Sequence, residues 1–138
     1  MPINVDRDWP SGLIRTRVRN PLGLDDVRSH LRTLRETRAF TFPELVDARD
    51  LSGRGVSTRD LKSVAWTART LFGQGVIADR AVVVRGDAAF RSARFVATLV
   101  TGCVRLGVFS EEDDAEHWLE ESQEWALPAG AEYRPKPT

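Results

Sequence analysis

Polar and apolar residues alternate near the start of the chain. Ile14, Thr16 and Val18 lie on one side of an extended segment and three arginines lie on the other, which is the period of two expected for a strand with one buried face. Another extended segment, residues 3–8, precedes it, and the turn-forming sequence WPSG separates the two. The pattern predicts an N-terminal β-hairpin.

Helical spacing follows the hairpin. Four segments carry apolar residues at every third or fourth position, as amphipathic helices do. Three short apolar runs between them are predicted strands: ELVDA after Pro43, Ala81–Val84 and Val104–Phe109. The inward residues of the four predicted helices include Val27, Leu31, Leu34, Leu61, Ala65, Phe72, Ala89, Ala93, Val100, Ala115, Trp118 and Leu119.

The order of these elements predicts an α/β fold, because helices alternate with strands after the hairpin. We expect a mixed sheet of about five strands, with the hairpin as an antiparallel edge, and about four helices. A chain of 138 residues suits one domain, which we place at residues 1–126. Residues 127–138 contain three prolines and no periodicity, so we expect them to form a loose C-terminal tail.

Charge and composition exclude some function classes. The 20 basic residues equal the 20 acidic ones, whereas nucleic-acid binders usually carry a basic excess, so we expect no nucleic-acid partner. No apolar run approaches the ~20 residues that span a bilayer, and no signal peptide is evident. We therefore expect no membrane span and a cytoplasmic location. Cys103 is the only cysteine, which leaves no internal disulfide.

Residues that often carry catalysis or metals are isolated in this sequence. His30 and His117 have no second ligand at metal-binding spacing, so we interpret both as residues at the edge of the core. Cys103 is interpreted as a small buried side chain. No nucleophile or acid–base pair can be named, and we therefore predict no enzyme, no catalytic residue, no metal and no cofactor.

Charged and glycine-rich segments also have ordinary explanations. The glycines at Gly53 and Gly55 lack the lysine and the spacing of a phosphate-binding loop. The acidic run Glu111–Asp114 falls in the first turn of a predicted helix, where the helix dipole favours negative charge. The arginines of the second strand are expected to face solvent or to pair with acidic helix residues.

Two groups of residues are candidate binding surfaces. Trp66 lies opposite the apolar stripe of its helix together with Lys62 and Thr70, and exposed tryptophans are enriched at binding hot spots. The helix near residues 87–100 is apolar around most of its circumference, which is typical of deep burial, a dimer face or a pocket wall. Its candidate pocket residues are Phe90, Phe95 and Leu99.

The order and spacing of these segments resemble a known family. The sequences GLIRTRVRNPLGLDDVRSHLRTL, PELVDARDL, AVVV and VRLGVFSEEDDAEHWL carry the resemblance. They are similar to the SpoIIAA-like proteins, small bacterial domains of the STAS group (sulphate transporter and anti-sigma-factor antagonist), which are also compared with CRAL-TRIO lipid-transfer domains. The resemblance covers residues 3–120 and implies a mixed sheet of about five strands with helices packed around it.

The same resemblance points to the start of the second predicted helix. Phosphorylatable anti-sigma antagonists carry Asp-Ser-Ser-Gly-Leu there, with one serine as the switch. Aligned with VSTRDL, that motif places Thr58 at the first serine and Leu61 at the leucine, while Asp60 replaces the glycine. Ser57 with Asp60 also resembles a helix capping box. Ser57 and Thr58 are therefore either a helix cap or a phosphorylation switch.

The sequence thus supports two hypotheses of function. The first is a non-enzymatic cytoplasmic domain, alone or as a homodimer, that binds a protein partner through Ser57, Thr58, Lys62 and Trp66. The alternative is a domain that binds a small apolar ligand or lipid through the residues of the third helix.

Overall fold

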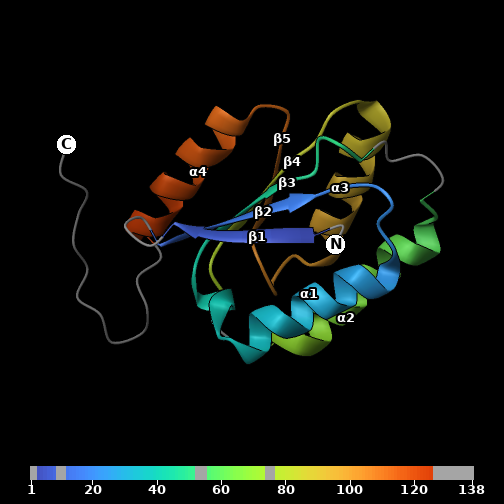
Figure 1. The fold of residues 1–138 in the computed structure, drawn as a ribbon, viewed down its shortest axis with the longest axis horizontal. Helices are drawn as coiled ribbons and strands as arrows, with labels where there is room; N and C mark the ends of the chain where they lie inside the picture. Colours follow the sequence, from blue (N-terminus) through green and yellow to red (C-terminus); the bar gives the residue numbers. More distant parts are fainter. Residues whose placement is uncertain (1–2, 9–11, 52–55, 74–76, 126–138) are drawn as a thin grey trace.

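Five strands and four α-helices follow one another in the predicted order (Figure 1). The computed structural model describes residues 3–8, 12–51, 56–73 and 77–125. The elements are β1 (Ile3–Asp8), β2 (Leu13–Val18), α1 (Leu24–Glu36), the short 3-10 helix η1 (Ala39–Thr41), β3 (Glu44–Asp47), α2 (Thr58–Phe72), β4 (Arg80–Val83), α3 (Asp87–Leu99), β5 (Leu106–Phe109) and α4 (Glu112–Trp125). The predicted tail lies outside the described residues.

The strands form one mixed sheet whose order, β1-β2-β3-β4-β5, is the order of the chain. β1 pairs with β2 in the antiparallel sense, and the pairs β2–β3, β3–β4 and β4–β5 are parallel. The prediction of a largely parallel sheet with an antiparallel hairpin at its edge is confirmed.

The register places residues in rows across the parallel strands, and successive rows face opposite sides of the sheet. One face carries the rows Ile14, Glu44, Arg80, Leu106 and Thr16, Val46, Val82, Val108. The other face carries the rows Arg15, Leu45, Ala81, Gly107 and Arg17, Asp47, Val83, Phe109. Each face has its own set of helices.

Helices α1, α2 and α3 cover the face that carries Ile14. Leu34 of α1, Phe72 of α2 and Val100 at the end of α3 are buried in one cluster with Ile14. The opposite face packs on α4, where Ala115 and Leu119 are buried against the sheet. Figure 1 shows α1 and α2 side by side in one layer and α4 on the other side of the sheet.

Several element boundaries differ from the sequence prediction by one or two residues. β4 starts at Arg80 instead of Ala81. β5 starts at Leu106 instead of Val104, because the amides of Cys103 and Val104 donate hydrogen bonds to the Val100 carbonyl at the end of α3. Asp87 is the first residue of α3, and Gly86 is the N-cap residue. Gly86 has a φ of 89°, a conformation that costs glycine little.

Substitution of Gly107 by alanine should destabilise the α4 face. An added Cβ would lie 2.7 Å from Cε2 of Phe109 and 3.2 Å from Cη2 of Trp118, and overpacking of this kind costs about 1–3 kcal/mol. Urea unfolding measures the loss. The same substitution in a Phe109→Leu background should cost less, because the ring atoms that clash are gone; equal losses in the two backgrounds would show that this contact is not the cause.

Candidate functional site

The outer face of α2 carries the most exposed large apolar side chain among the described residues. Trp66 is 72% exposed, while Ala65 and Phe72 of the same helix are buried in the core. Lys62 and Thr70, one turn before and one turn after Trp66, are also exposed. The Thr70 hydroxyl donates a hydrogen bond to the Trp66 carbonyl at 2.8 Å. The three residues predicted from the helical pattern therefore share one exposed face.

The N-terminus of α2 adjoins this face. Ser57 is the N-cap residue, and its Oγ accepts a hydrogen bond from the backbone N–H of Asp60 at 3.0 Å. Thr58 is the first residue of the helix, and both hydroxyl residues are exposed. Ser57 therefore acts as a helix cap, whereas phosphorylation of Ser57 or Thr58 stays a prediction.

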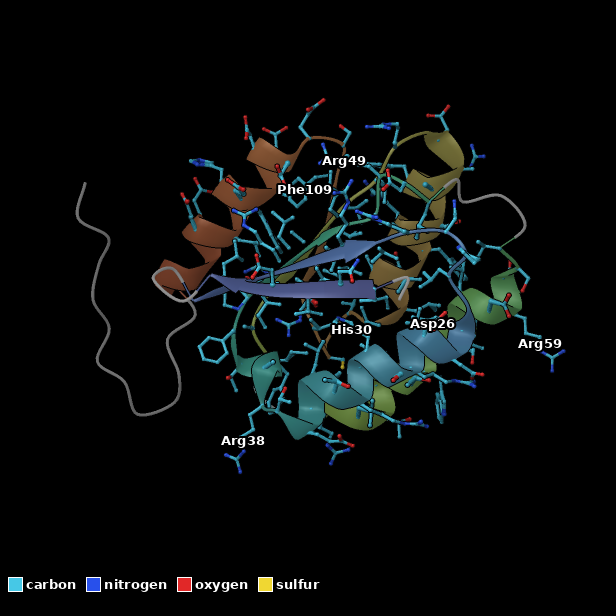
Figure 2. All side chains as sticks on the ribbon, viewed as in Figure 1. Asp26, His30, Arg38, Arg49, Arg59 and Phe109 are labelled. Carbon is cyan, nitrogen blue, oxygen red and sulfur yellow. The ribbon has the colours of Figure 1, made fainter. Side chains whose placement is uncertain are left out.

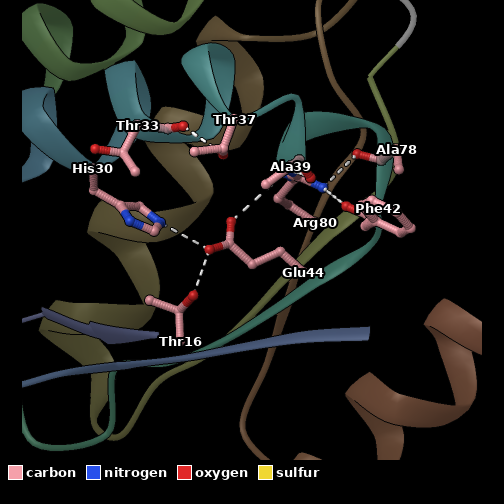
Figure 3. A network of polar contacts seen from close by, with 9 residues as sticks. All are labelled: Thr16, His30, Thr33, Thr37, Ala39, Phe42, Glu44, Ala78 and Arg80. Atoms are coloured by element: carbon pink, nitrogen blue, oxygen red, sulfur yellow. Dashed lines mark hydrogen bonds and ion pairs between the residues drawn. The ribbon is translucent and has the colours of Figure 1, made fainter. Parts of the chain in front are cut away.

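A buried polar network lies between the sheet and the layer of α1 and α2 (Figure 3). Glu44, at the start of β3, is 2% exposed. Its Oε2 accepts a hydrogen bond from the Thr16 hydroxyl at 2.5 Å and lies 2.8 Å from Nε2 of His30. Its Oε1 lies 3.6 Å from Nε of Arg80, the register partner of Glu44 on β4. The network thus joins three strands to α1.

The Arg80 guanidinium also binds the segment that follows α1. It donates hydrogen bonds to the carbonyls of Phe42 and Ala78, and to that of Ala39 at 3.5 Å. Arg80 is only 6% exposed, so the carbonyls and the Glu44 carboxylate replace the water that its charge loses on burial.

These contacts keep Glu44 ionised. Burial alone would raise the pKa of Glu44, but the His30 hydrogen bond, the charge of Arg80 and the Thr16 hydroxyl together lower it below its ordinary value of 4.5. An ionised carboxylate only accepts hydrogen bonds, so Nε2 of His30 must be the donor. Both oxygens of Glu44 face donors of the protein, and the residue is only 2% exposed, so a ligand in solvent cannot reach the carboxylate. The network is therefore a structural element of the core.

Sequence reasoning missed this network. The interpretation of His30 as a residue at the edge of the core agrees with its side-chain exposure of 13%, but its carboxylate partner comes from a distant strand. A sequence signal for the pair did exist: Glu44 and Arg80 each directly precede three residues of a buried strand, and their charges are opposite. Only the strand register places them side by side.

Arg15 of β2 pairs with acidic residues of a helix, one of the two predicted arrangements, whereas Arg17 pairs with an acidic residue of the segment after β3. Arg15 lies 2.7 Å from Glu116 and 3.7 Å from Glu112 of α4, and Arg17 lies 3.5 Å from Asp50. Arg15, Arg17 and Glu112 line a cleft of about 240 Å³ beside the N-terminus of α4, together with Asp6 and Asp47. Hydrogen bonds from Arg49 lower the pKa of Asp47, so positive and negative groups balance there.

The remaining candidates lie apart from α2. Cys103 is half-buried against the Ile14 cluster, not fully buried as interpreted from the sequence, and burial raises the pKa of its thiol. His117 is exposed and lies 3.0 Å from Glu121. Phe90 packs with Val18 and Val84, whereas Leu99 packs against the Ile14 cluster, and Phe95 is half-buried. The apolar pocket stays a prediction, because no contact of these residues tests it.

Two general findings concern the described part of the chain. It contains no group of three His, Cys, Asp or Glu side chains arranged to hold a metal ion. None of its helices combines the length and the apolar character needed to cross a bilayer.

A solved structure has the same architecture. It is an uncharacterized protein of the DUF3478 family with a SpoIIAA-like fold, from Shewanella loihica PV-4, and it aligns with a TM-score of 0.55 over 85% of this chain and 91% of its own. The chain has a SpoIIAA-like fold. Sequence identity is 18%. A similarity at this level supports the shared fold, but it assigns no function to individual residues. No protein family and no curated protein sequence matches the chain.

Replacing Glu44 by glutamine should destabilise the SpoIIAA-like fold by about 3–5 kcal/mol at pH 7, because it leaves the Arg80 charge buried without a counter-charge. The pKa of Glu44 is lowered on folding, so the ionised carboxylate stabilises the fold above about pH 4.5. That contribution disappears as the pH falls through the folded-state pKa. The difference between parent and variant in urea unfolding should therefore shrink below about pH 4.5.

The matched control for that measurement is Glu116→Gln. This removes a carboxylate whose side chain is one-third exposed and whose ion pair with Arg15 lies at the surface, where such pairs contribute about 0–1 kcal/mol. A Glu44→Gln variant as stable as the Glu116→Gln control would show that the buried pair contributes nothing to the fold.

Ser57→Ala should lower the free energy of unfolding by about 1 kcal/mol, because it removes the acceptor for the Asp60 N–H. Thr58→Ala should change it by less than about 0.5 kcal/mol, since an exposed helix residue with no cap bond contributes little. Thermal or urea unfolding of both variants measures these changes. Equal losses at the two positions would contradict the assignment of Ser57 as the cap.

Proposed function

We propose that this protein is a non-enzymatic protein-interaction domain whose contact surface is the outer face of α2. The α2 surface comprises Ser57, Thr58, Lys62, Trp66 and Thr70. The observation that carries the proposal is the 72% exposure of Trp66. A SpoIIAA-like fold supports a regulatory role of this kind, and a cytoplasmic location and a homodimeric form belong to the proposal.

Burial of the Trp66 side chain in a complex would contribute substantial free energy. A tryptophan covers on the order of 200 Å², so covering its exposed part at about 25 cal/mol per Å² is worth roughly 3–4 kcal/mol. Hot-spot residues of protein interfaces cost 2 kcal/mol or more when truncated. Trp66 alone therefore meets that range.

The surroundings of Trp66 suit a protein partner. Lys62 and Thr70 are exposed one turn before and one turn after Trp66, so polar residues flank the aromatic residue along the helix, as at an apolar anchor within a polar rim. The surface is also supported from below, because Ala65 and Ala68 of α2 are buried in the core. A rigid helix that presents a fixed anchor loses little conformational entropy on binding.

Trp66→Ala should weaken binding to the natural partner at least about 30-fold, the equivalent of about 2 kcal/mol at a hot spot. The partner is first identified by photo-crosslinking in the host from a benzoyl-phenylalanine at position 66, and the affinities of parent and variant are then measured with the purified partner. Because Trp66 is exposed, the variant should unfold at nearly the same urea concentration as the parent.

Val5→Ala is the matched control. Val5 is also an exposed apolar residue, at 49%, but it belongs to β1 at the edge of the sheet. Its truncation should leave partner affinity within about twofold. If Trp66→Ala binds the partner as tightly as Val5→Ala does, the α2 surface is not the contact site.

The alternative function is binding of a small apolar ligand at Phe90, Phe95 and Leu99. Native mass spectrometry of protein purified from its host separates the two. A dimer or an unmodified monomer agrees with the interaction domain, a bound apolar molecule supports the alternative, and a phosphate on Ser57 or Thr58 adds a switch to the α2 surface.

A further inference from the structure

A groove of about 830 Å³ lies where α1 and α2 end, beside η1. It opens at the far end of α2 from the Ser57 cap. Its lining residues are Arg35, Arg38, Phe40, Arg69, Thr70, Leu71, Phe72 and Gly73. We call it the arginine groove.

Three guanidinium groups surround the arginine groove. Arg35 comes from the last turn of α1, Arg38 from the turn that follows it, and Arg69 from the last turn of α2. Among the residues that the structure describes, no Asp or Glu lines the groove. Glu36, the neighbour of Arg35 along α1, is exposed and is not part of the lining.

The helix ends account for only part of this positive charge. The C-terminus of a helix carries the equivalent of about half a negative charge. The ends of α1 and α2, with the end of α3 that Arg69 contacts, offer about one and a half negative charges to three guanidinium groups. A structural role as helix-end partners therefore explains about half of the positive charge.

Arg69 is held in place by the protein itself. Its Nη1 donates hydrogen bonds to the carbonyls of Leu99 and Thr101 at 3.1 and 3.3 Å. Those carbonyls lie at the C-terminus of α3, so they orient the guanidinium and offset only about half of its charge. A fixed cation beside the groove favours an anionic ligand, because less side-chain freedom is lost on binding.

Arg38 occupies a backbone conformation that arginine seldom adopts. Its φ is 59° and its ψ is 19°, and it is the only described residue other than glycine with a positive φ. Glycine is the usual residue at such a position after a helix. Figure 2 shows Arg38 projecting from the opposite end of the α1–α2 layer to Arg59. An arginine here supplies charge at a position where glycine would be less strained.

Aromatic and aliphatic side chains also line the groove. The rings of Phe40 and Phe72 meet at a centroid distance of 5.7 Å. Phe72 is buried, whereas Phe40 and Leu71 are only partly buried. Apolar surface therefore remains for the body of a ligand next to the guanidinium groups.

We propose that the arginine groove binds a small anionic amphiphile, with a phosphate or carboxylate head group on the guanidinium groups of Arg35, Arg38 and Arg69 and an apolar body against Phe40 and Leu71. Guanidinium groups recognise both heads through paired N–H donors. The proposal does not rest on the function assigned to the α2 surface. Thr70 belongs to both sites, but Trp66 does not line the groove and none of the three arginines belongs to the α2 surface.

Isothermal titration calorimetry with decyl phosphate, below its micelle concentration, tests the proposal. Decyl phosphate should bind at least tenfold more tightly than inorganic phosphate, which lacks the apolar body, and decyltrimethylammonium should not bind. Decanoate should also bind, because it offers the other head group. Equal affinity for the cationic and anionic amphiphiles would overturn the proposal, as would equal affinity for decyl phosphate and inorganic phosphate.

Two variants locate the head group. Arg35→Gln and Arg38→Gly should each weaken decyl phosphate binding about tenfold or more, since each removes a charged hydrogen-bond donor. Arg38→Gly should melt at a temperature no lower than the parent, because glycine relieves the positive φ, so its loss of binding cannot be attributed to unfolding. Arg91→Gln, an exposed arginine of α3, is the matched control and should bind within twofold of the parent.

Backbone NMR shifts give the position of the ligand independently. Titration with decyl phosphate should shift the amide signals of Arg38, Thr70 and Gly73, and Trp66→Ala should leave this binding within twofold of the parent. Unchanged affinity in both arginine variants, or shifts confined to other parts of the molecule, would overturn the proposal whatever the result at the α2 surface.

Discussion

The fold depends on one buried ion pair and the hydrogen bonds that complete it. Glu44 and Arg80 begin adjacent parallel strands and face each other beneath the helices. Each charge would be costly to bury alone, so the strands must meet in the register that pairs them. A slip of one residue would turn one of these side chains to the other face of the sheet. Thr16 and His30 then extend the same constraint to β2 and α1.

That arrangement determines which surfaces are free. Within the layer of α1, α2 and α3, one side of α2 is buried in the core. The opposite side of α2, which carries Trp66, faces solvent. The two ends of α2 then differ in chemistry. The N-terminal end has two exposed hydroxyl groups, one of which caps the helix, and the C-terminal end has guanidinium groups that outnumber the helix charges around them. One helix thus presents two separate candidate sites.

Periodicity was sufficient to predict the fold and the exposed face of α2. The alternation at Ile14, Thr16 and Val18 identified β2, and helical spacing correctly placed Trp66 opposite Ala65 and Ala68. Two kinds of feature could not be predicted. The Glu44 network depends on partners up to 36 residues apart, which only the strand register brings together. The arginine groove joins the ends of two helices and a turn whose backbone, at Arg38, departs from the usual residue preference.

The order of the strands also bears on how the chain reaches this structure. Each strand pairs with the strand that precedes it in the sequence. In the parallel pairs Ile14 meets Glu44, Glu44 meets Arg80 and Arg80 meets Leu106. No strand pair of this sheet joins the first strand to the last. Contacts of moderate sequence separation favour faster folding. During synthesis, the strand with which each later strand first pairs has therefore already left the ribosome.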